Sequence, residues 1–561
     1  MVVCVREPGA KLAMRVTSQL SVLLLASLSL VSTASAQLRA DQVLVVFDDR
    51  IPDSAAVASA YAAARPGVRL VNLNTVRPPI GEPQVPPPLL GPGNATYQQF
   101  IDGLRKPLRD HLASRGLTTA IRSIVLTKGL PHRITDINNA GAGDSPATAQ
   151  TLQNAGNYTA ASVDAELCLL WQNLSANERN GGGDSRADGY IWNPYFKSTQ
   201  PINSFSNANI GFAKTLVNAN VNIYPPGFAW RSAGTAGTAA LTAGDFYLVC
   251  RLDGRTVADV QALINRSVAP RVDLSTAFIL LDESGNLPFE ACTPAVTEFD
   301  NNNFIDIYGG DDFERTRDQI IGRTTVAVPP APIGSCTSAT ARDFRFPVAN
   351  ILYNSSPGTT SFFVGPRVGV ATGNLIVSNP VLVISTEGAN HGGGIPVNGQ
   401  FFPASFNYTQ GAFFNSIESY NGRDFGGLGG FGIQGQVADF ITAGGTFALA
   451  NVNEPFTITE PKTNLFVRNF VQGSLSFAEA AYSALPVLSY QQIAIGDPLA
   501  RLVRSTDDVN GDGLLNIDDL YAWHASQRDT NGDGLINSTD RRAQESLQRA
   551  IEPLFMSSPQ R

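Results

Sequence analysis

The sequence predicts an α/β body, built on a mostly parallel sheet flanked by helices, followed by a small all-α domain. Three observations lead to this prediction. Short apolar runs alternate with helical stretches over most of the chain, which is typical of crossover units between parallel strands. Long Asn- and Gly-rich segments separate several of these units. After Arg504 the chain becomes acidic and repeats one spacing pattern twice, which indicates a separate domain.

Short apolar runs are predicted as buried strands at residues 42–47, 68–73, 121–127, 246–252, 276–281, 381–385 and 446–450. Helices are predicted at residues 52–64, 162–171 and 256–267, and along an apolar stripe from Phe100 through Leu104 and Leu108 to Leu112. Pro107 is expected to bend the helix that carries this stripe. Residues 173–209 and 390–435 are Asn/Gly-rich and are predicted as long surface loops.

The first residues have the pattern of a secretory signal. Arg15 supplies a positive charge, residues 20–31 are apolar, and Ala34-Ser35-Ala36 is a small-residue cleavage site. The start is either Met1 or Met14, and the apolar run is shorter than the roughly 20 residues of a membrane span. We expect an exported protein without a membrane span. Its predicted parts are a signal peptide at 1–36, an α/β body at 37–504 and a calcium-binding domain at 505–561.

Composition and charge narrow the function further. The chain is 43% hydrophobic and 9% aromatic, as in a globular protein, and its net charge is −8. A nucleic-acid partner is not expected, because phosphate binding needs clustered Lys and Arg.

Four cysteines follow the signal segment. Their sequence order suggests the disulfides Cys168–Cys250 and Cys292–Cys336, although four cysteines allow three connectivities. Buried free thiols are an equally weighted alternative. No CxxC pair is present, so a zinc site built on cysteine is not expected.

The acidic tail contains two loops of the pattern D-x-N-x-D-G-x-x-N-x-x-D. Calcium prefers six to eight oxygen ligands, and the glycine at position 6 allows the turn that gathers them around one ion. Side-chain oxygens come from positions 1, 3, 5 and 12, a backbone carbonyl from position 7, and position 9 binds directly or through water. The predicted ligands of the first ion are Asp508, Asn510, Asp512, Leu514, Asn516 and Asp519. Those of the second ion are Asp529, Asn531, Asp533, Leu535, Asn537 and Asp540.

Two details of the loops suggest a paired, calcium-folded module. Position 8 is aliphatic in both loops, Leu515 and Ile536, as two loops packed back to back would require. Position 12 is aspartate, where a standard EF-hand has a glutamate that binds through both oxygens. Without calcium the carboxylates of each loop repel one another, so we expect the tail to be poorly folded without metal.

The duplicated loops resemble dockerin domains of the EF-hand type (type I), over about the last tenth of the chain. Dockerins attach exported proteins to cohesin modules on scaffold proteins or cell surfaces, so the resemblance implies a cohesin-like or cell-surface partner. In the family, positions 10 and 11 help to select the partner. Ser538-Thr539 matches that pattern, and Ile517-Asp518 does not. Position 13 is usually aliphatic, which holds for Leu520 and not for Arg541.

The body resembles an uncharacterised family of exported bacterial proteins with a caspase- and gingipain-like α/β core. The matching stretches begin at Val43, Ile124, Ser162 and Gly473. In gingipain-like peptidases a His-Gly pair follows one strand and the nucleophilic cysteine follows the next. His391-Gly392 after the strand at 381–385 matches the first position. The strand at 446–450 is taken as the next one, and no cysteine lies anywhere after Cys336. The resemblance therefore implies a body without the thiolate nucleophile.

Other residues with chemical potential have simpler interpretations. Asp164 and Glu166 stand at a helix start, where the helix dipole favours carboxylates, and this outweighs an acid–base pair. Lys128 and His132 follow a strand and could line a pocket, but a surface loop is favoured. His524 is expected to be exposed. Residues 300–312 are acidic, but Phe304 replaces a ligand and the glycine is missing, so they are not an EF-type loop.

The combined prediction is an exported protein that binds two calcium ions through a docking module on a non-catalytic, peptidase-like body. The alternative is a secreted hydrolase, either a peptidase with a substituted nucleophile or a component of extracellular polysaccharide degradation. A glycoside hydrolase needs two carboxylates flanking a sugar cleft, and the sequence singles out no such pair.

Overall fold

The computed structural model describes most of the predicted body and a short part of the tail. The described residues are 37–135, 161–171, 191–205, 246–273, 276–282, 313, 316–317, 323–325, 336–338, 348–354, 362–367, 375–387, 399–418, 420–425, 435–453, 460–473, 475–488, 490–504, 517–525 and 527. The predicted signal peptide lies outside them. No helix among the described residues is long and apolar enough to cross a membrane.

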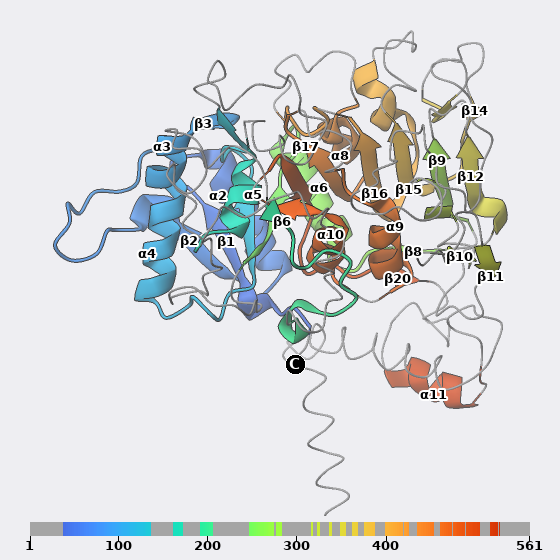
Figure 1. The fold of residues 1–561 in the computed structure, drawn as a ribbon, viewed down its shortest axis with the longest axis horizontal. Coiled ribbons are helices and arrows are strands. Elements are labelled where there is room, and N and C mark those ends of the chain that lie inside the picture. The colour runs from blue at the N-terminus through green and yellow to red at the C-terminus, as the bar shows by residue number, and fades with distance from the viewer. Residues whose placement is uncertain are drawn as a thin grey trace, which may run out of the picture.

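A ten-stranded sheet forms the centre of the molecule (Figure 1). Its strands are, in spatial order, β12 (Ile351–Asn354), β9 (Phe278–Asp282), β15 (Val381–Glu387), β16 (Tyr408–Ile417), β17 (Phe447–Asn451), β19 (Gln492–Ile495), β7 (Leu248–Leu252), β4 (Ser123–Thr127), β1 (Val43–Phe47) and β2 (Arg69–Asn72). β17 and β19 are antiparallel, and β19 meets β7 at the single pair Ile495 and Arg251. All neighbouring strands other than the pair β17 and β19 are parallel, including β19 and β7. The predicted mostly parallel α/β sheet is therefore confirmed.

Helices cover both faces of this sheet. The longer helices and helical turns are α2 (Pro52–Ala64), α3 (Tyr97–Phe100), α4 (Lys106–Ser114), α5 (Val163–Cys168), α6 (Val257–Ser267), α8 (Val437–Thr442), α9 (Thr463–Phe466), α10 (Phe477–Ala484) and α11 (Ile517–Ala525). Short 3-10 turns are at Ala40–Gln42, Leu73–Thr75, Ile202–Ser204, Val348–Asn350 and Gly399–Ser405, and π-helical turns at Ile101–Arg105 and Val467–Val471. Side chains of α2, α6 and α8 share one core cluster, and those of α4, α5, α9 and α10 share the other.

The two clusters are the two faces of the sheet, because successive side chains of a strand point to opposite sides. In β1, Val43 and Val45 belong to one cluster, while Leu44 and Val46 belong to the other, and all four are fully buried. Strands buried on both faces read as continuous apolar runs. This is why β1, β4, β9, β15 and β17 were predictable, whereas β2 is an edge strand with Arg69 and Leu70 exposed and β7 contains one charged residue, Arg251.

Two predicted surface loops are wrong in their described parts. Residues 390–435 contain β16, whose last seven residues are buried in the sheet. Residues 173–209 contain 191–205, where Tyr195 and Ile202 belong to the core. Asn193 is buried there and donates two hydrogen bonds to carbonyls of Tyr482 and Leu485. Buried polar residues of this kind read as loop in a sequence, although hydrogen bonds pair them in the fold.

The predicted helix with the Phe100–Leu112 stripe is present but not continuous. α3 and α4 are joined by the π-helical turn Ile101–Arg105, and all four stripe residues are fully buried. Pro107 lies at the start of α4. Because proline has no N–H to donate to the preceding turn, a locally wider turn before it is expected.

Short two-stranded ladders complete the body. They pair β3 (Asn94–Thr96) with β5 (Arg133–Thr135), β6 (Ile191–Trp192) with β18 (Val487–Leu488), β8 (Arg271–Val272) with β20 (Val503–Arg504), β10 (Arg323–Thr325) with β11 (Cys336–Ser338), and β13 (Phe363–Val364) with β14 (Leu375–Ile376).

Candidate functional site

The calcium loops lie almost entirely outside the described residues. The exception is the end of the first loop, where α11 begins at Ile517 and includes Asp519. The Asp519 side chain is fully buried, whereas His524 on the same helix is exposed, as predicted. The remaining predicted ligands, from Asp508 to Asn516 and from Asp529 to Asp540, are outside the described residues, as are residues 300–312. The calcium sites therefore stay a prediction.

Within the body, polar residues gather where the parallel strands end, which we call the carboxyl edge. Open α/β sheets usually place their sites at this edge. Its members are Asp48 after β1, Lys128 after β4, Asp253 after β7, Asp282 ending β9, Asn354 ending β12, Glu387 ending β15, Glu418 after β16 and Asn451 ending β17. All eight are buried. The sequence carries a weak signal of this edge, because a polar residue directly ends or follows each apolar run.

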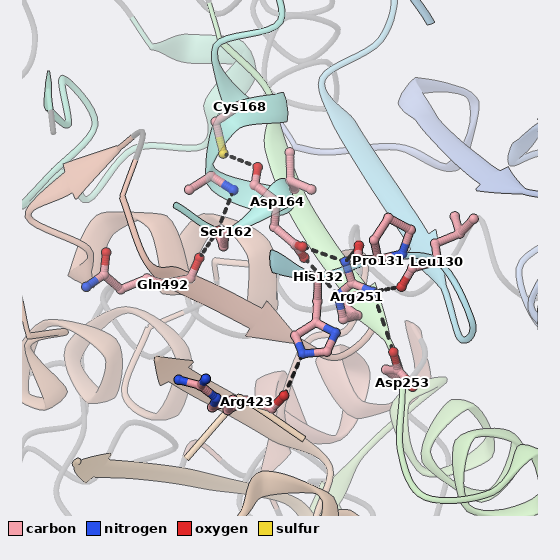
Figure 2. A network of polar contacts seen from close by, with 12 residues as sticks. Leu130, Pro131, His132, Ser162, Asp164, Cys168, Arg251, Asp253, Arg423 and Gln492 are labelled. Carbon is pink, nitrogen blue, oxygen red and sulfur yellow. Dashed lines mark hydrogen bonds and ion pairs between the residues drawn. The ribbon is translucent and has the colours of Figure 1, made fainter. Parts of the chain in front are cut away.

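Contacts between distant segments join the two halves of the carboxyl edge. His132, which follows β4, is 2.7 Å from the carbonyl oxygen of Arg423, which follows β16. Ser162 donates to the carbonyl of Gln492 at 2.7 Å, and Gln492 is the partner of Asn451 in the β17–β19 pair. These contacts place the ends of β4, β16 and β17 in one region of the molecule (Figure 2).

The fully buried guanidinium of Arg251 lies at the centre of this region (Figure 2). It forms a two-bond ion pair with Asp164, at 3.2 and 2.6 Å, and lies 3.5 Å from Asp253. It also donates to the carbonyls of Leu130 and Pro131, at 3.1 and 2.8 Å. Burial alone would lower the pKa of Arg251, but the carboxylates of Asp164 and Asp253 together outweigh this and raise it. Asp164 is thus a partner of Arg251, not simply a helix-dipole carboxylate.

Lys128 and His132 are buried, so the favoured surface-loop interpretation is wrong. The Lys128 ammonium donates to the carbonyl of Gly254 at 2.7 Å and lies 3.6 Å from Asp253. The His132 ring meets Phe425 edge-on, with 5.2 Å between ring centroids. Burial, with the positive charge of Arg251 as the next cause, holds the pKa of His132 well below its usual value. The ring is therefore neutral, and its Nε2–H is the donor to the Arg423 carbonyl.

The other end of the carboxyl edge holds carboxyl groups that favour their protonated form. Burial raises the pKa of Glu418 to about 8 and that of Asp282 to about 7, and the charge of Glu387 adds to both shifts. Glu418 accepts hydrogen bonds from Ser416 at 2.7 Å and from the Gly435 backbone at 2.9 Å. A carboxyl group that keeps a proton near neutral pH is chemically able to act as a general acid.

Amide side chains fix the backbone beside Glu418. Asn451 donates to the carbonyl of Glu418 at 2.9 Å and to both carboxylate oxygens of Glu460, at 3.0 and 3.1 Å. Asn421 accepts from the backbone N–H of Asn451 at 2.7 Å. These bonds connect β16 and β17 through polar groups that a sequence-based reading assigns to loops.

The described thiols are not placed to act as nucleophiles. Cys168 and Cys250 are buried and free, so the predicted Cys168–Cys250 disulfide is wrong and the free-thiol alternative holds for both. Burial raises the pKa of each thiol, so both stay protonated. Cys292 lies outside the described residues, and Cys336 is placed in β11 without a described side chain. The predicted Cys292–Cys336 bridge therefore stays untested.

The strand order corrects the expected position of the nucleophile. β15 is followed, in the chain and in the sheet, by β16 and not by the strand at 446–450, which is β17. Glu418 and Ser419 come directly after β16, so no cysteine occupies the corrected position either. His391 and Gly392 lie outside the described residues.

No protein-family model matches this chain, and no curated protein matches it. Among solved structures, the crystal structure of the Arg-specific cysteine proteinase gingipain R is similar to it, with a TM-score of 0.38 and 9% sequence identity. The similarity covers 84% of this chain and 79% of that chain. It spans most of both proteins but is too distant to transfer the role of any residue.

Proposed function

We propose that this chain is an exported protein whose C-terminal domain binds two calcium ions and docks to a cohesin-like or cell-surface partner. The observation that carries the proposal is the tandem pair of complete ligand sets, from Asp508 to Asp519 and from Asp529 to Asp540.

The body is proposed to be a caspase- and gingipain-like scaffold that binds rather than cleaves. Two features support this part of the proposal. Glu418 and Ser419 follow β16, where the resemblance implies a cysteine nucleophile. The described thiols Cys168 and Cys250 are neutral and enclosed in the core.

Calcium titration of the full mature chain tests the calcium part of the proposal. Isothermal titration calorimetry should give two bound ions per chain, and Asp512→Ala with Asp533→Ala should remove both. Asp53→Asn, which changes an exposed carboxylate at the start of α2, should leave two. Affinity capture with the full chain should recover a partner with calcium and lose it with chelator. Calcium binding without calcium-dependent capture would reject the docking role alone.

One observation favours a second candidate, a hydrolase with a substituted nucleophile. In the sequence Ser419 follows Glu418, two residues after the end of β16, and the carboxyl group of Glu418 keeps its proton near neutral pH. A fluorophosphonate probe separates the candidates, since it labels activated serine. Labelling of the wild type that Ser419→Ala abolishes and Ser59→Ala retains would establish the hydrolase; Ser59 is an exposed serine on α2. We expect no labelling.

A further inference from the structure

Arg133 is a half-buried arginine whose guanidinium has no hydrogen-bond or ion-pair partner within the described part of the chain. Its Nε is shielded from solvent and makes no hydrogen bond. Arg251 offers a contrast nearby, because two carboxylates and two carbonyls surround its guanidinium. Charged side chains are rarely buried without a partner, since leaving water costs free energy that a partner must offset. The Arg133 position is therefore prepared for a negative group that the described part of the chain does not supply.

The backbone fixes Arg133 at the carboxyl edge. As the first residue of β5, it is paired with Asn94 of β3, and its N–H donates to the carbonyl of Gly93 at 3.1 Å. The N–H of His132 donates to the same carbonyl at 3.0 Å. A Cβ atom at Gly93 would lie 3.9 Å from Nη2 of Arg133, so the glycine borders the guanidinium. The backbone of Arg133 is thus already ordered, so less conformational entropy is lost when its side chain binds a ligand.

Arg423 brings a second guanidinium into the same region. Its carbonyl is tied to His132, and its guanidinium carbon lies 5.1 Å from the ring centroid of Tyr420. Burial lowers the pKa of Arg133 to about 10, with the positive charge of Arg423 as the next cause, and Asp424 offsets part of this. Burial also lowers the pKa of Arg423. Two cations near each other in a partly buried region repel, and an anion between them would relieve that repulsion.

We propose that Arg133, together with Arg423, binds an oxyanion group of a ligand at the carboxyl edge. A guanidinium presents its N–H donors in a planar fork that matches two oxygens of a carboxylate or sulfate. Most of the other charges nearby cancel, because Asp164 and Asp253 pair with Arg251 and Lys128, and the ring of His132 is neutral. Asp424 is the opposing carboxylate. The site is independent of the calcium module, so failure of either proposal leaves the other standing.

Thermal unfolding of the full chain, with calcium present, tests the site. The probes are sodium sulfate and N-acetylglycine, and N-acetylglycine amide is the neutral control. We expect a concentration-dependent rise in Tm for the wild type, and at least about tenfold weaker binding in Arg133→Gln, since one charge-assisted pair is lost. Arg115→Gln, at the exposed C-terminal end of α4, should respond like the wild type. Comparison with this control separates binding at Arg133 from the general stabilising effect of sulfate on folded proteins.

The outcomes separate the ligand sources. A response to sulfate alone supports a free inorganic anion as the ligand. A response to N-acetylglycine but not to its amide supports a carboxylate-bearing organic ligand. An equal response of the wild type and Arg133→Gln to every probe would overturn the proposal.

Stability without added anion gives a second, independent test. If Arg133 serves a ligand, then Arg133→Gln removes an unpaired half-buried charge, and its Tm in low-salt buffer should equal or exceed that of the wild type. Arg133→Lys should keep part of the anion response, because it retains the charge without the planar fork. A clear loss of Tm in anion-free Arg133→Gln, or failure to fold, would make the guanidinium structural and reject the site.

Discussion

Arg251 illustrates how one residue organises a buried polar region. Its side chain comes from β7, its carboxylate partner Asp164 from the first turn of α5, and two of its acceptors from the loop after β4. Each of these groups would be costly in the core without the others, because burial penalises unpaired charge. Because these groups pair with one another, they fix the relative positions of β7, α5 and the loop after β4.

Replacing Arg251 by Met should destabilise the fold by about 3–5 kcal/mol, because it leaves Asp164 buried without its cation. Urea unfolding measures this change. Arg39→Met is the matched control, since Arg39 pairs with Asp41 at 3.0 Å on the surface, where an ion pair contributes little. If both variants unfold at the same urea concentration, the buried pair is not a stability determinant.

Glu418 predicts a pH dependence of stability. Burial raises its pKa from 4.5 to about 8, so the folded state holds the proton more tightly than the unfolded state. Stability should therefore fall as pH rises from about 4.5 to about 8, by up to about 1.4 kcal/mol per pH unit for this group. Asp282 adds the same trend between 3.8 and about 7.

Glu418→Gln should flatten this decline, most clearly between pH 7 and 8, because the amide does not titrate. Urea unfolding at several pH values provides the measurement. Glu82→Gln serves as the control, since Glu82 is an exposed partner of Lys106 and should leave the slope unchanged. Identical slopes for wild type and Glu418→Gln would contradict the assignment.

At the scale of elements, the turn between α3 and α4 supports the Pro-rich loop that precedes β3. Gly103 in this turn faces Leu90, which is buried at the end of the loop. A Cβ atom at Gly103 would lie 2.6 Å from Cδ1 of Leu90, closer than atoms can approach. Because Gly103 has no side chain, Leu90 can pack against this turn and hold the end of the loop in place.

Gly103→Ala should destabilise the protein by about 1–3 kcal/mol through overpacking, and should expose the loop to protease. Gly91→Ala is the matched control, because a Cβ there has nothing within 4 Å. Urea unfolding and limited proteolysis provide the readouts. Equal cleavage rates in the two variants would show that the loop is held by other contacts.

The elements also show what a sequence can predict. β1 and β4 are short apolar runs and β7 is apolar apart from Arg251, so local pattern was sufficient. β16 was missed because it contains Gln410, Asn415 and Ser416, and the buried Asn415 is paired by Thr463 and the Pro461 carbonyl. The calcium ligands follow from local spacing alone. The carboxyl edge does not, because contacts such as His132 with Arg423 join residues separated by 291 positions.

At the scale of the whole molecule, the predicted boundary near Ser505 implies two units that unfold separately. Calorimetry of the full chain in calcium should show two transitions. Chelation should remove the transition of the tail and leave that of the body in place, because the described core clusters are built from body residues. Asp512→Ala with Asp533→Ala should reproduce the chelated profile in calcium. One transition that moves as a whole would reject the boundary.

The position of β19 sets the order in which the molecule can be completed. This strand is formed by residues 492–495, yet it lies in the middle of the sheet, between β17 and β7. A chain that emerges from the ribosome N-terminus first cannot join the two halves of its sheet until nearly the whole body has been synthesised. Until then β7 and β17 each present an unpaired edge, which can bind chaperones or a second nascent chain. Completion of this fold is therefore a late event in the life of the chain.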